Sequence, residues 1–228
     1  VGDAAGIGPE IAVRVLKDRQ LVSSADIRLY GPEAVLREAL RRFAPEISPE
    51  IVNTASLSFQ DFTPGVLSAA AGKAAYDTIV RATKDVIAGK ADAIVTCPVN
   101  KAAINEAGIP FTGHTELIAE LCGTRNFAMM QSAGKLRVIF VTTHIALKEV
   151  SAHVTRERIT EVARLVAGAA RAEGVRNPAI AVAGLNPHAG ENGHMGMEDE
   201  TIVKPAVADL KAEGMNVSGP YPSDTLFI

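Results

Sequence analysis

The chain has 228 residues, a formal net charge of −3 at pH 7 and only 4% aromatic residues. This length is sufficient for one large or two modest domains with a real hydrophobic core. The slight excess of acidic residues and the lack of tryptophan argue against nucleic-acid binding, which needs a basic surface or aromatic stacking platforms. No apolar run approaches the ~20 residues of a membrane span, and we recognise no signal peptide.

The cysteine content indicates the compartment. The two cysteines, Cys97 and Cys122, do not form a CxxC pair, which fits a reducing cytoplasm and argues against a disulfide framework or a thiolate zinc site.

The chain starts at Val1 directly on a glycine-rich loop and stops at Ile228 in an apolar run that resembles the opening of a strand. We therefore expect a piece of a longer protein that lacks a short N-terminal segment and a larger C-terminal one.

Strand and helix patterns alternate along the chain, which predicts an α/β fold with a largely parallel sheet. Gly108-Ile109-Pro110 interrupts this pattern, so we expect a first α/β domain over residues 1–106 and a second over 107–228. The predicted elements are, in chain order, a helix from Gly8, a strand at 27–30, a helix at 32–43, a short strand near Ile51, a helix at 69–88, a strand at 93–96, a helix at 113–121, strands at 127–130 and 138–141, an amphipathic helix at 155–173, a strand at 179–183 and a helix at 198–213.

Two histidines follow two predicted strands. Thr142-Thr143-His144 comes after one apolar run, and His188 lies in the rigid loop Gly184-Leu185-Asn186-Pro187-His188-Ala189-Gly190-Glu191 after another. Open α/β sheets bind ligands at the carboxyl ends of their strands. We therefore expect His144 and His188 to share one metal ion or one anionic substrate. Two ligands do not complete a catalytic zinc site, which usually takes three protein ligands and a water.

The glycine-rich loop Gly2 to Glu10 leads into the first predicted helix. Free backbone N–H groups at such a position suit a phosphate or a carboxylate, but a tight strand-to-helix turn explains the glycines equally well. Ile11 stands where a dinucleotide-binding fingerprint needs its third glycine, so the loop is not a Rossmann motif. It also lacks the Gly-Lys-Ser/Thr ending of a P-loop.

Two further segments carry candidate substrate groups. Lys101 ends Thr96-Cys97-Pro98-Val99-Asn100-Lys101 and is a candidate for proton transfer or phosphate contact, although most lysines are only solvated surface residues. His114 and Thr115 open the next predicted helix, where the positive end of the helix dipole favours an anion. The alternative for this second segment is a capping motif with an incidental histidine.

The remaining candidates carry less weight. Asp224 is a candidate to bind substrate by orienting an amine, or to orient a metal ligand, and is also an ordinary turn residue. His153 precedes a predicted helix, and His194 lies in a glycine-rich loop that suits a mobile lid. The sequence has no Gly-x-Ser-x-Gly elbow and no cysteine with a local histidine signature, so covalent acyl transfer is poorly supported. A non-enzymatic binding module remains an alternative.

Together these segments resemble the 4-hydroxythreonine-4-phosphate dehydrogenases of pyridoxal phosphate biosynthesis. The resemblance rests on 2–10, 96–101, 108–116, 142–144 and 186–191 and covers essentially the whole chain. The first motif also resembles the Gly-Asp-Gly-Ile-Gly-Pro-Glu loop of isocitrate and isopropylmalate dehydrogenases. The resemblance implies two α/β domains around a cleft, in a cytoplasmic homodimer with the active site near the interface and the dimer contacts in the second domain.

The resemblance also implies cofactors and a reaction. The family binds a divalent cation (Zn, Mg, Co or Mn) through three histidines, of which His144 and His188 match two, and His114 and Thr115 match its substrate-binding pair. The third histidine and much of the NAD site are expected beyond Ile228. The implied reaction is NAD-dependent oxidation and decarboxylation of 4-phosphohydroxy-L-threonine, with the cation lowering the pKa of the hydroxyl and basic groups anchoring the phosphate.

Relatives of this family provide alternatives for the substrate. Some oxidise D-threonate or D-erythronate 4-phosphate, and others oxidise aromatic cis-dihydrodiol carboxylates. Ala4-Ala5 stands where Pro-Ala is more usual in the pyridoxal pathway enzymes, which favours a sugar-acid relative. A catalytically silent protein that binds phosphorylated acids, and a phosphotransacetylase-like acyltransferase, are more distant alternatives.

Overall fold

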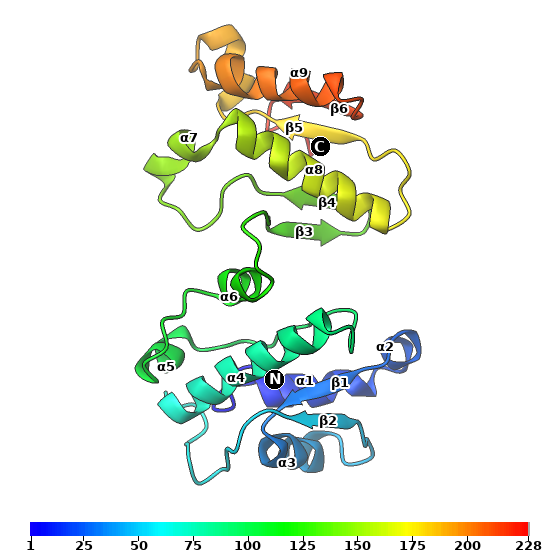
Figure 1. The fold of residues 1–228 in the computed structure, drawn as a ribbon, viewed down its shortest axis with the longest axis vertical. Helices are drawn as coiled ribbons and strands as arrows, with labels where there is room; N and C mark the ends of the chain where they lie inside the picture. The colour runs from blue at the N-terminus through cyan, green and yellow to red at the C-terminus, as the bar shows by residue number, and fades with distance from the viewer. Residues whose placement is uncertain (228) are drawn as a thin grey trace. The chain divides into compact units, whose positions relative to one another are not determined.

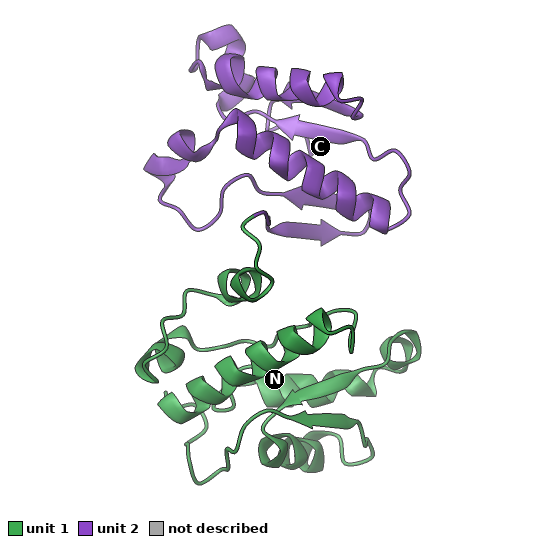
Figure 2. Cartoon of the chain, viewed as in Figure 1, with its two compact units in different colours: residues 1–125 green, residues 126–228 purple. Residues whose placement is uncertain are grey.

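Two compact units make up residues 1–227, the part of the chain that the computed structural model describes. The first unit runs from Val1 to Arg125 and the second begins at Asn126 (Figure 2). The helix His114–Leu121, which follows the domain division expected between residues 106 and 107, lies within the first compact unit. No helix among the described residues is long and apolar enough to cross a membrane.

The first unit combines a small parallel sheet with helices (Figure 1). Its strands pair in register from Arg28 with Glu50 to Gly31 with Asn53. Its elements are α1 (Gly8–Arg14), η1 (Val15–Lys17), α2 (Arg19–Ser24), β1 (Arg28–Gly31), α3 (Glu33–Phe43), β2 (Glu50–Asn53), α4 (Ala69–Ile87), α5 (Lys101–Glu106) and α6 (His114–Leu121).

Separate hydrophobic clusters hold the first unit together. Val13 of α1, Leu29 of β1 and Leu36 of α3 pack in one cluster, because the apolar residues of α3 recur at the spacing of one helix face. Ile104 of α5 and Leu117 of α6 belong to another, together with residues of α4. The second cluster fixes the two short helices that carry Lys101 and His114 at their first residues.

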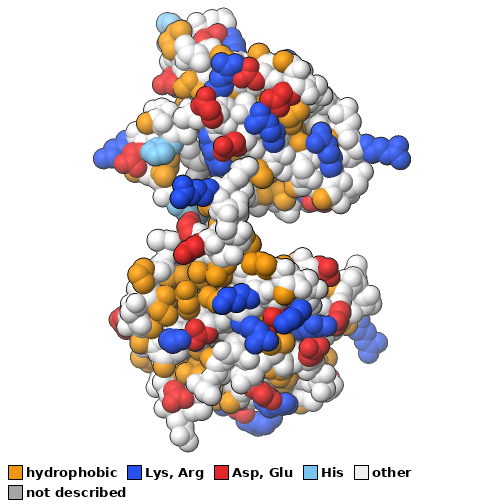
Figure 3. Space-filling view, viewed as in Figure 1, with side chains coloured by type: hydrophobic (Ala, Val, Ile, Leu, Met, Phe, Trp, Pro, Cys, Tyr) orange, Lys and Arg blue, Asp and Glu red, His pale blue; other side chains and the backbone are white. Residues whose placement is uncertain are grey.

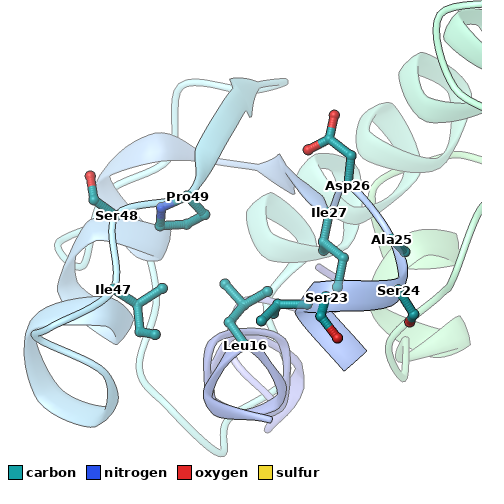
Figure 4. Close-up of a pocket in the computed structure, with 10 residues that line it drawn as sticks. Leu16, Ser23, Ser24, Ala25, Asp26, Ile27, Ile47, Ser48 and Pro49 are labelled. Carbon is teal, nitrogen blue, oxygen red and sulfur yellow. The ribbon is translucent and has the colours of Figure 1, made fainter. Parts of the chain in front are cut away.

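A pocket of about 650 Å³ lies where the chain enters β1 and β2. Leu16, Ile27 and Ile47 point into it, whereas the carboxylate of Asp26 points away (Figure 4). None of the site residues predicted from the sequence is among the described residues that line it. The pocket is therefore not the site that the motifs indicate.

The predicted strand at 93–96 is wrong. Residues 91–100 run without regular secondary structure, and no strand among residues 1–227 pairs with them. A strand needs a neighbour to satisfy its backbone hydrogen bonds, and without one Val95 stays 96% exposed.

Hydrophobic side chains also gather on the face of the first unit where α4 lies (Figure 3).

The second unit places α8 and α9 on short strands (Figure 1). Strands β5 and β6 are parallel, and β3 and β4 form an antiparallel hairpin. Its elements are β3 (Met130–Ala133), β4 (Leu136–Ile139), η2 (Leu147–Glu149), α7 (Val150–His153), α8 (Arg156–Ala172), β5 (Ile180–Ala183), η3 (Pro187–Gly193), the π-helical turn η4 (Asp199–Val203), α9 (Lys204–Ala212) and β6 (Val217–Tyr221).

Two details of the second unit differ from the prediction. Strand β3 begins three residues later than expected and joins β4 through a tight turn in which Gly134 has a φ of +55°, so this pair is antiparallel rather than parallel. Strand β6 was not predicted, because Gly219 and Pro220 lie inside it and these residues normally argue against a strand. The predicted helices at 155–173 and 198–213 are confirmed within one or two residues at their ends.

Candidate functional site

The glycine-rich loop packs directly against the segment that leads to Lys101. The backbone N–H of Asp3 donates a hydrogen bond of 2.9 Å to the carbonyl of Pro98. A Cβ atom at Gly2 would lie 1.9 Å from that same carbonyl oxygen, so only glycine permits this approach. The structure thus joins two motifs that are far apart in the sequence, and it accounts for Gly2 by packing.

Lys101 is the first residue of α5 and its side chain is exposed. Asn100 caps this helix, because its side chain accepts a hydrogen bond of 3.2 Å from the backbone of Ala103. Helix α5 also lies very close to α4: a Cβ atom at Gly72 would lie 2.3 Å from the carbonyl oxygen of Ala103. The position of Lys101 is therefore set by a cap and by a contact that only glycine allows.

His114 is half-buried at the start of α6. Its ring meets the ring of Phe111 edge to face, with 6.1 Å between the centroids. Burial lowers the pKa of the imidazole below its ordinary value, and the positive charge of Lys101 lowers it further. Its Nε2 atom is buried and has no hydrogen-bond partner among the described residues.

Charged groups surround the backbone at Gly113. A Cβ atom there would lie 2.6 Å from a carboxylate oxygen of Glu116 and 3.7 Å from the Lys101 ammonium. Thr115 is exposed next to them. The structure therefore gathers three predicted site residues, Lys101, His114 and Thr115, around one helix start.

Asn105, which was not predicted as a site residue, holds this group together. Its side-chain amide donates to the carbonyl of Phe111 at 3.1 Å and accepts from the N–H of Phe111 at 3.1 Å. Both backbone groups of the residue that packs against His114 are thus held by α5. No local motif marks such an asparagine, because the contact depends on how the chain returns to the helix.

The two predicted metal ligands share an uncommon backbone conformation in the second unit. His144 has a φ of +57° and His188 a φ of +54°, a region that residues other than glycine rarely adopt. Both side chains are exposed, in the segments that follow β4 and β5. Strained backbone of this kind concentrates at functional sites, which supports the selection of these two histidines.

His188 lies next to Asp224. The Nδ1 atom of His188 is 3.9 Å from a carboxylate oxygen of Asp224, and both side chains are 59% exposed. The hydroxyl of Ser223 donates a hydrogen bond of 2.6 Å to the carbonyl of Gly184. The loop after β6 is thereby held against the loop after β5, so the structure brings together two residues that were selected separately.

A buried carboxylate lies beneath the His188 loop. Asp199 is fully buried and accepts hydrogen bonds from the backbone N–H groups of Leu185 at 2.8 Å and Asn186 at 2.9 Å. The amide of Asn186 also contacts Glu198 at 2.9 Å. Asp199 was not predicted as a site residue, because an acidic residue at the start of a helix is ordinary by sequence alone.

The side chains of His188 and Asp224 provide only part of a binding site for a divalent cation. Imidazole and carboxylate are usual ligands of Zn²⁺, and His188 and Asp224 offer one of each. Among residues 1–227 no cluster of three or more His, Cys, Asp or Glu side chains is arranged to hold a metal ion. The other two histidines, His153 and His194, are exposed, and His153 contacts the carbonyl of Glu149 at 2.9 Å.

Comparison with known proteins gives a consistent result. The family model "Pyridoxal phosphate biosynthetic protein PdxA" matches residues 12–228. A 4-hydroxythreonine-4-phosphate dehydrogenase of Ectopseudomonas mendocina is 41% identical over 240 residues, which cover 99% of this chain and 71% of that protein. A D-threonate 4-phosphate dehydrogenase of Pectobacterium atrosepticum is 37% identical over 244 residues, which cover 100% of this chain and 75% of that protein.

A solved structure agrees with the fold. The crystal structure of 4-hydroxythreonine-4-phosphate dehydrogenase from Klebsiella pneumoniae superposes with a TM-score of 0.88 at 40% identity, covering 99% of this chain and 74% of that one. The α/β fold class and the family resemblance drawn from the sequence are therefore confirmed.

Proposed function

Because the chain belongs to the PdxA family of pyridoxal phosphate biosynthetic proteins, we propose that it is a dehydrogenase of 4-phosphohydroxy-L-threonine. The reaction is an oxidation of the secondary alcohol with loss of the carboxyl group as carbon dioxide, and it depends on NAD and a divalent cation. The observation that carries this proposal is the match of 99% of the chain to the E. mendocina enzyme of that name.

In this proposal, NAD supplies a hydride acceptor when bound, and the cation supplies a Lewis acid at the hydroxyl oxygen. His144 and His188 hold the cation, and their left-handed backbones support this role. A divalent cation held by these two imidazoles would need at least one further protein ligand. Asp224, next to His188, binds the substrate by orienting its amino group.

The groups around the start of α6 bind the anionic part of the substrate. Lys101 presents an ammonium, and the first turn of α6 adds free N–H groups and the positive end of a dipole. Since burial and Lys101 both lower the pKa of His114, its imidazole is neutral at pH 7 and Nε2 hydrogen-bonds the substrate. Lys101 also serves as the catalytic proton carrier, and Thr115 donates a hydroxyl.

We further propose a cytoplasmic homodimer with the active site near the subunit interface. The presence of only two cysteines, both free, supports a reducing compartment. The dimer follows from the family resemblance, and sedimentation velocity of the full chain tests it directly.

D-Threonate 4-phosphate is the second candidate substrate, with the same chemistry. The P. atrosepticum relative carries that name, and Ala4-Ala5 in the glycine-rich loop favours it. Kinetics with the two substrates, at saturating NAD and Mn²⁺, separates the candidates. A higher kcat/KM for 4-phosphohydroxy-L-threonine supports the first proposal, a higher value for the sugar acid supports the second, and no NADH from either contradicts both.

A further inference from the structure

We propose that Asp199 is a positioning residue that fixes the loop carrying His188 in its ligand-binding conformation. This inference rests on the proposed role of His188 as a cation ligand. Asp199 itself is fully buried and lies beneath the loop, so it touches neither cation nor substrate in this account. It acts through the backbone that it holds.

The contacts of Asp199 converge on the chain just before His188. One carboxylate oxygen accepts from the N–H of Leu185, and the other accepts from the N–H and the side-chain amide of Asn186, at 2.8, 2.9 and 3.1 Å. Hydrogen bonds to an ionised acceptor are stronger than neutral ones. A buried carboxylate whose partners all come from one short loop is built to hold that loop.

The loop needs such support, because its backbone is strained. Five consecutive residues, 188–192, have φ between +45° and +78°, and four of them are not glycine. The left-handed conformation is unfavourable for each residue that carries a Cβ atom. It persists only where the surroundings hold it in place.

Asp199 also packs against the strained turn itself. A Cβ atom at Gly190 would lie 3.3 Å from Cβ of Asp199, and a Cβ at Gly184 would lie 3.1 Å from its carboxylate oxygen. The turn is closed by a hydrogen bond of 3.1 Å from Met195 N–H to the carbonyl of Gly190. Without the carboxylate, two partly buried N–H groups lose their acceptor and the turn is free to relax away from Asp224.

The experiment compares three variants of the full chain. Asp199→Ala removes the acceptors, and Asp199→Asn retains one oxygen in a side chain of nearly the same shape. Val207→Ala is the matched control, because Val207 is also buried in the second unit but packs with Leu210 and Val217, away from the loop. Three quantities are measured: the Zn²⁺ dissociation constant by calorimetry, amide exchange at Leu185 and Asn186, and steady-state kinetics.

We expect Asp199→Ala to weaken Zn²⁺ binding and lower kcat by about 10–100-fold, the usual effect of losing a group that orients a metal ligand. Amide exchange at Leu185 and Asn186 accelerates, and Asp199→Asn restores part of each loss. Val207→Ala lowers the melting temperature but leaves the Zn²⁺ affinity unchanged. Zn²⁺ affinity and amide protection equal to the control in Asp199→Ala would overturn the inference.

The design also separates this inference from the function on which it rests. If the unaltered chain binds no Zn²⁺ and needs no cation for turnover, the ligand role of His188 fails. Amide exchange then still decides whether Asp199 holds the loop, because that readout requires no metal.

Discussion

The Nδ1 atom of His188 lies 3.9 Å from a carboxylate oxygen of Asp224, although the π-helical turn η4, helix α9 and strand β6 separate the two residues in the sequence. The parallel pairing of β5 with β6 produces this relationship, since both loops leave the carboxyl end of the same small sheet. Both side chains remain exposed. The two side chains are therefore accessible to a cation or a polar substrate, and they do not form a buried structural ion pair.

Replacement of His188 by alanine tests the cation site. His188→Ala removes one proposed ligand, and we expect both Mn²⁺ affinity and kcat to fall by at least about 10–100-fold. His153→Ala is the control, because His153 is exposed and its ring hydrogen-bonds the carbonyl of Glu149 rather than a proposed site residue. Equal turnover in the two variants would remove His188 from the site.

The titration of His114 tests the electrostatics at the start of α6. Its pKa lies below the ordinary value of 6.5, so the unfolded chain binds the proton more readily than the folded one. The contribution to stability is therefore complete above pH 6.5 and is lost as the pH falls through the lowered pKa. NMR titration of the ring protons measures this pKa, and a value above 6.5 would contradict the account.

Removal of the Lys101 charge separates the two causes of this shift. Lys101→Ala raises the pKa of His114, because a neighbouring positive charge disfavours the imidazolium. The pKa still stays below 6.5, since burial is the larger cause. Lys101→Arg, which retains the charge, provides the control and leaves the pKa lowered. No change in Lys101→Ala would mean that the two groups do not interact.

The close approach of α4 and α5 predicts opposite outcomes for two helical glycines. Gly72→Ala forces a Cβ to within 2.3 Å of the Ala103 backbone, and overpacking of this kind destabilises by about 1–3 kcal/mol. Gly168→Ala in α8 has open space around the new Cβ and stabilises by about 0.5–1 kcal/mol, the usual gain of alanine over glycine within a helix.

Urea denaturation gives both free energies of unfolding. We also expect Gly72→Ala to impair catalysis, because the displaced helix begins at Lys101. A Gly72→Ala variant as stable as the unaltered chain would show that α4 and α5 do not approach as closely as described.

Local patterns predicted most of the elements, and they selected the candidate site residues, whose roles remain predictions. The spacing of apolar residues predicted α8, and the positions of His144 and His188 after apolar runs selected two histidines that have left-handed backbones. Such signals involve only a few neighbouring residues, and they can therefore be recognised in a sequence. The proximity of His188 and Asp224 could not be predicted from the sequence, because it depends on a strand that contains Gly219 and Pro220.

Contacts between distant segments explain the other differences. The run at 93–96 has the composition of a buried strand, but Val95 is 96% exposed, because composition does not guarantee a pairing partner. Asp199 and Asn105 each hold backbone groups of a loop that lies elsewhere in the sequence. The residues next to Asp199 and Asn105 in the sequence do not indicate that these side chains hold a distant loop.

The central claim is a cation-dependent oxidative decarboxylation, and product stoichiometry tests it most directly. NADH and carbon dioxide are measured together from carboxyl-labelled 4-phosphohydroxy-L-threonine, before and after treatment with a chelator, and again after Mn²⁺ is restored. The account predicts equimolar NADH and carbon dioxide that disappear together on chelation and return together with Mn²⁺. NADH without carbon dioxide, or equal turnover in the presence of the chelator, would contradict it.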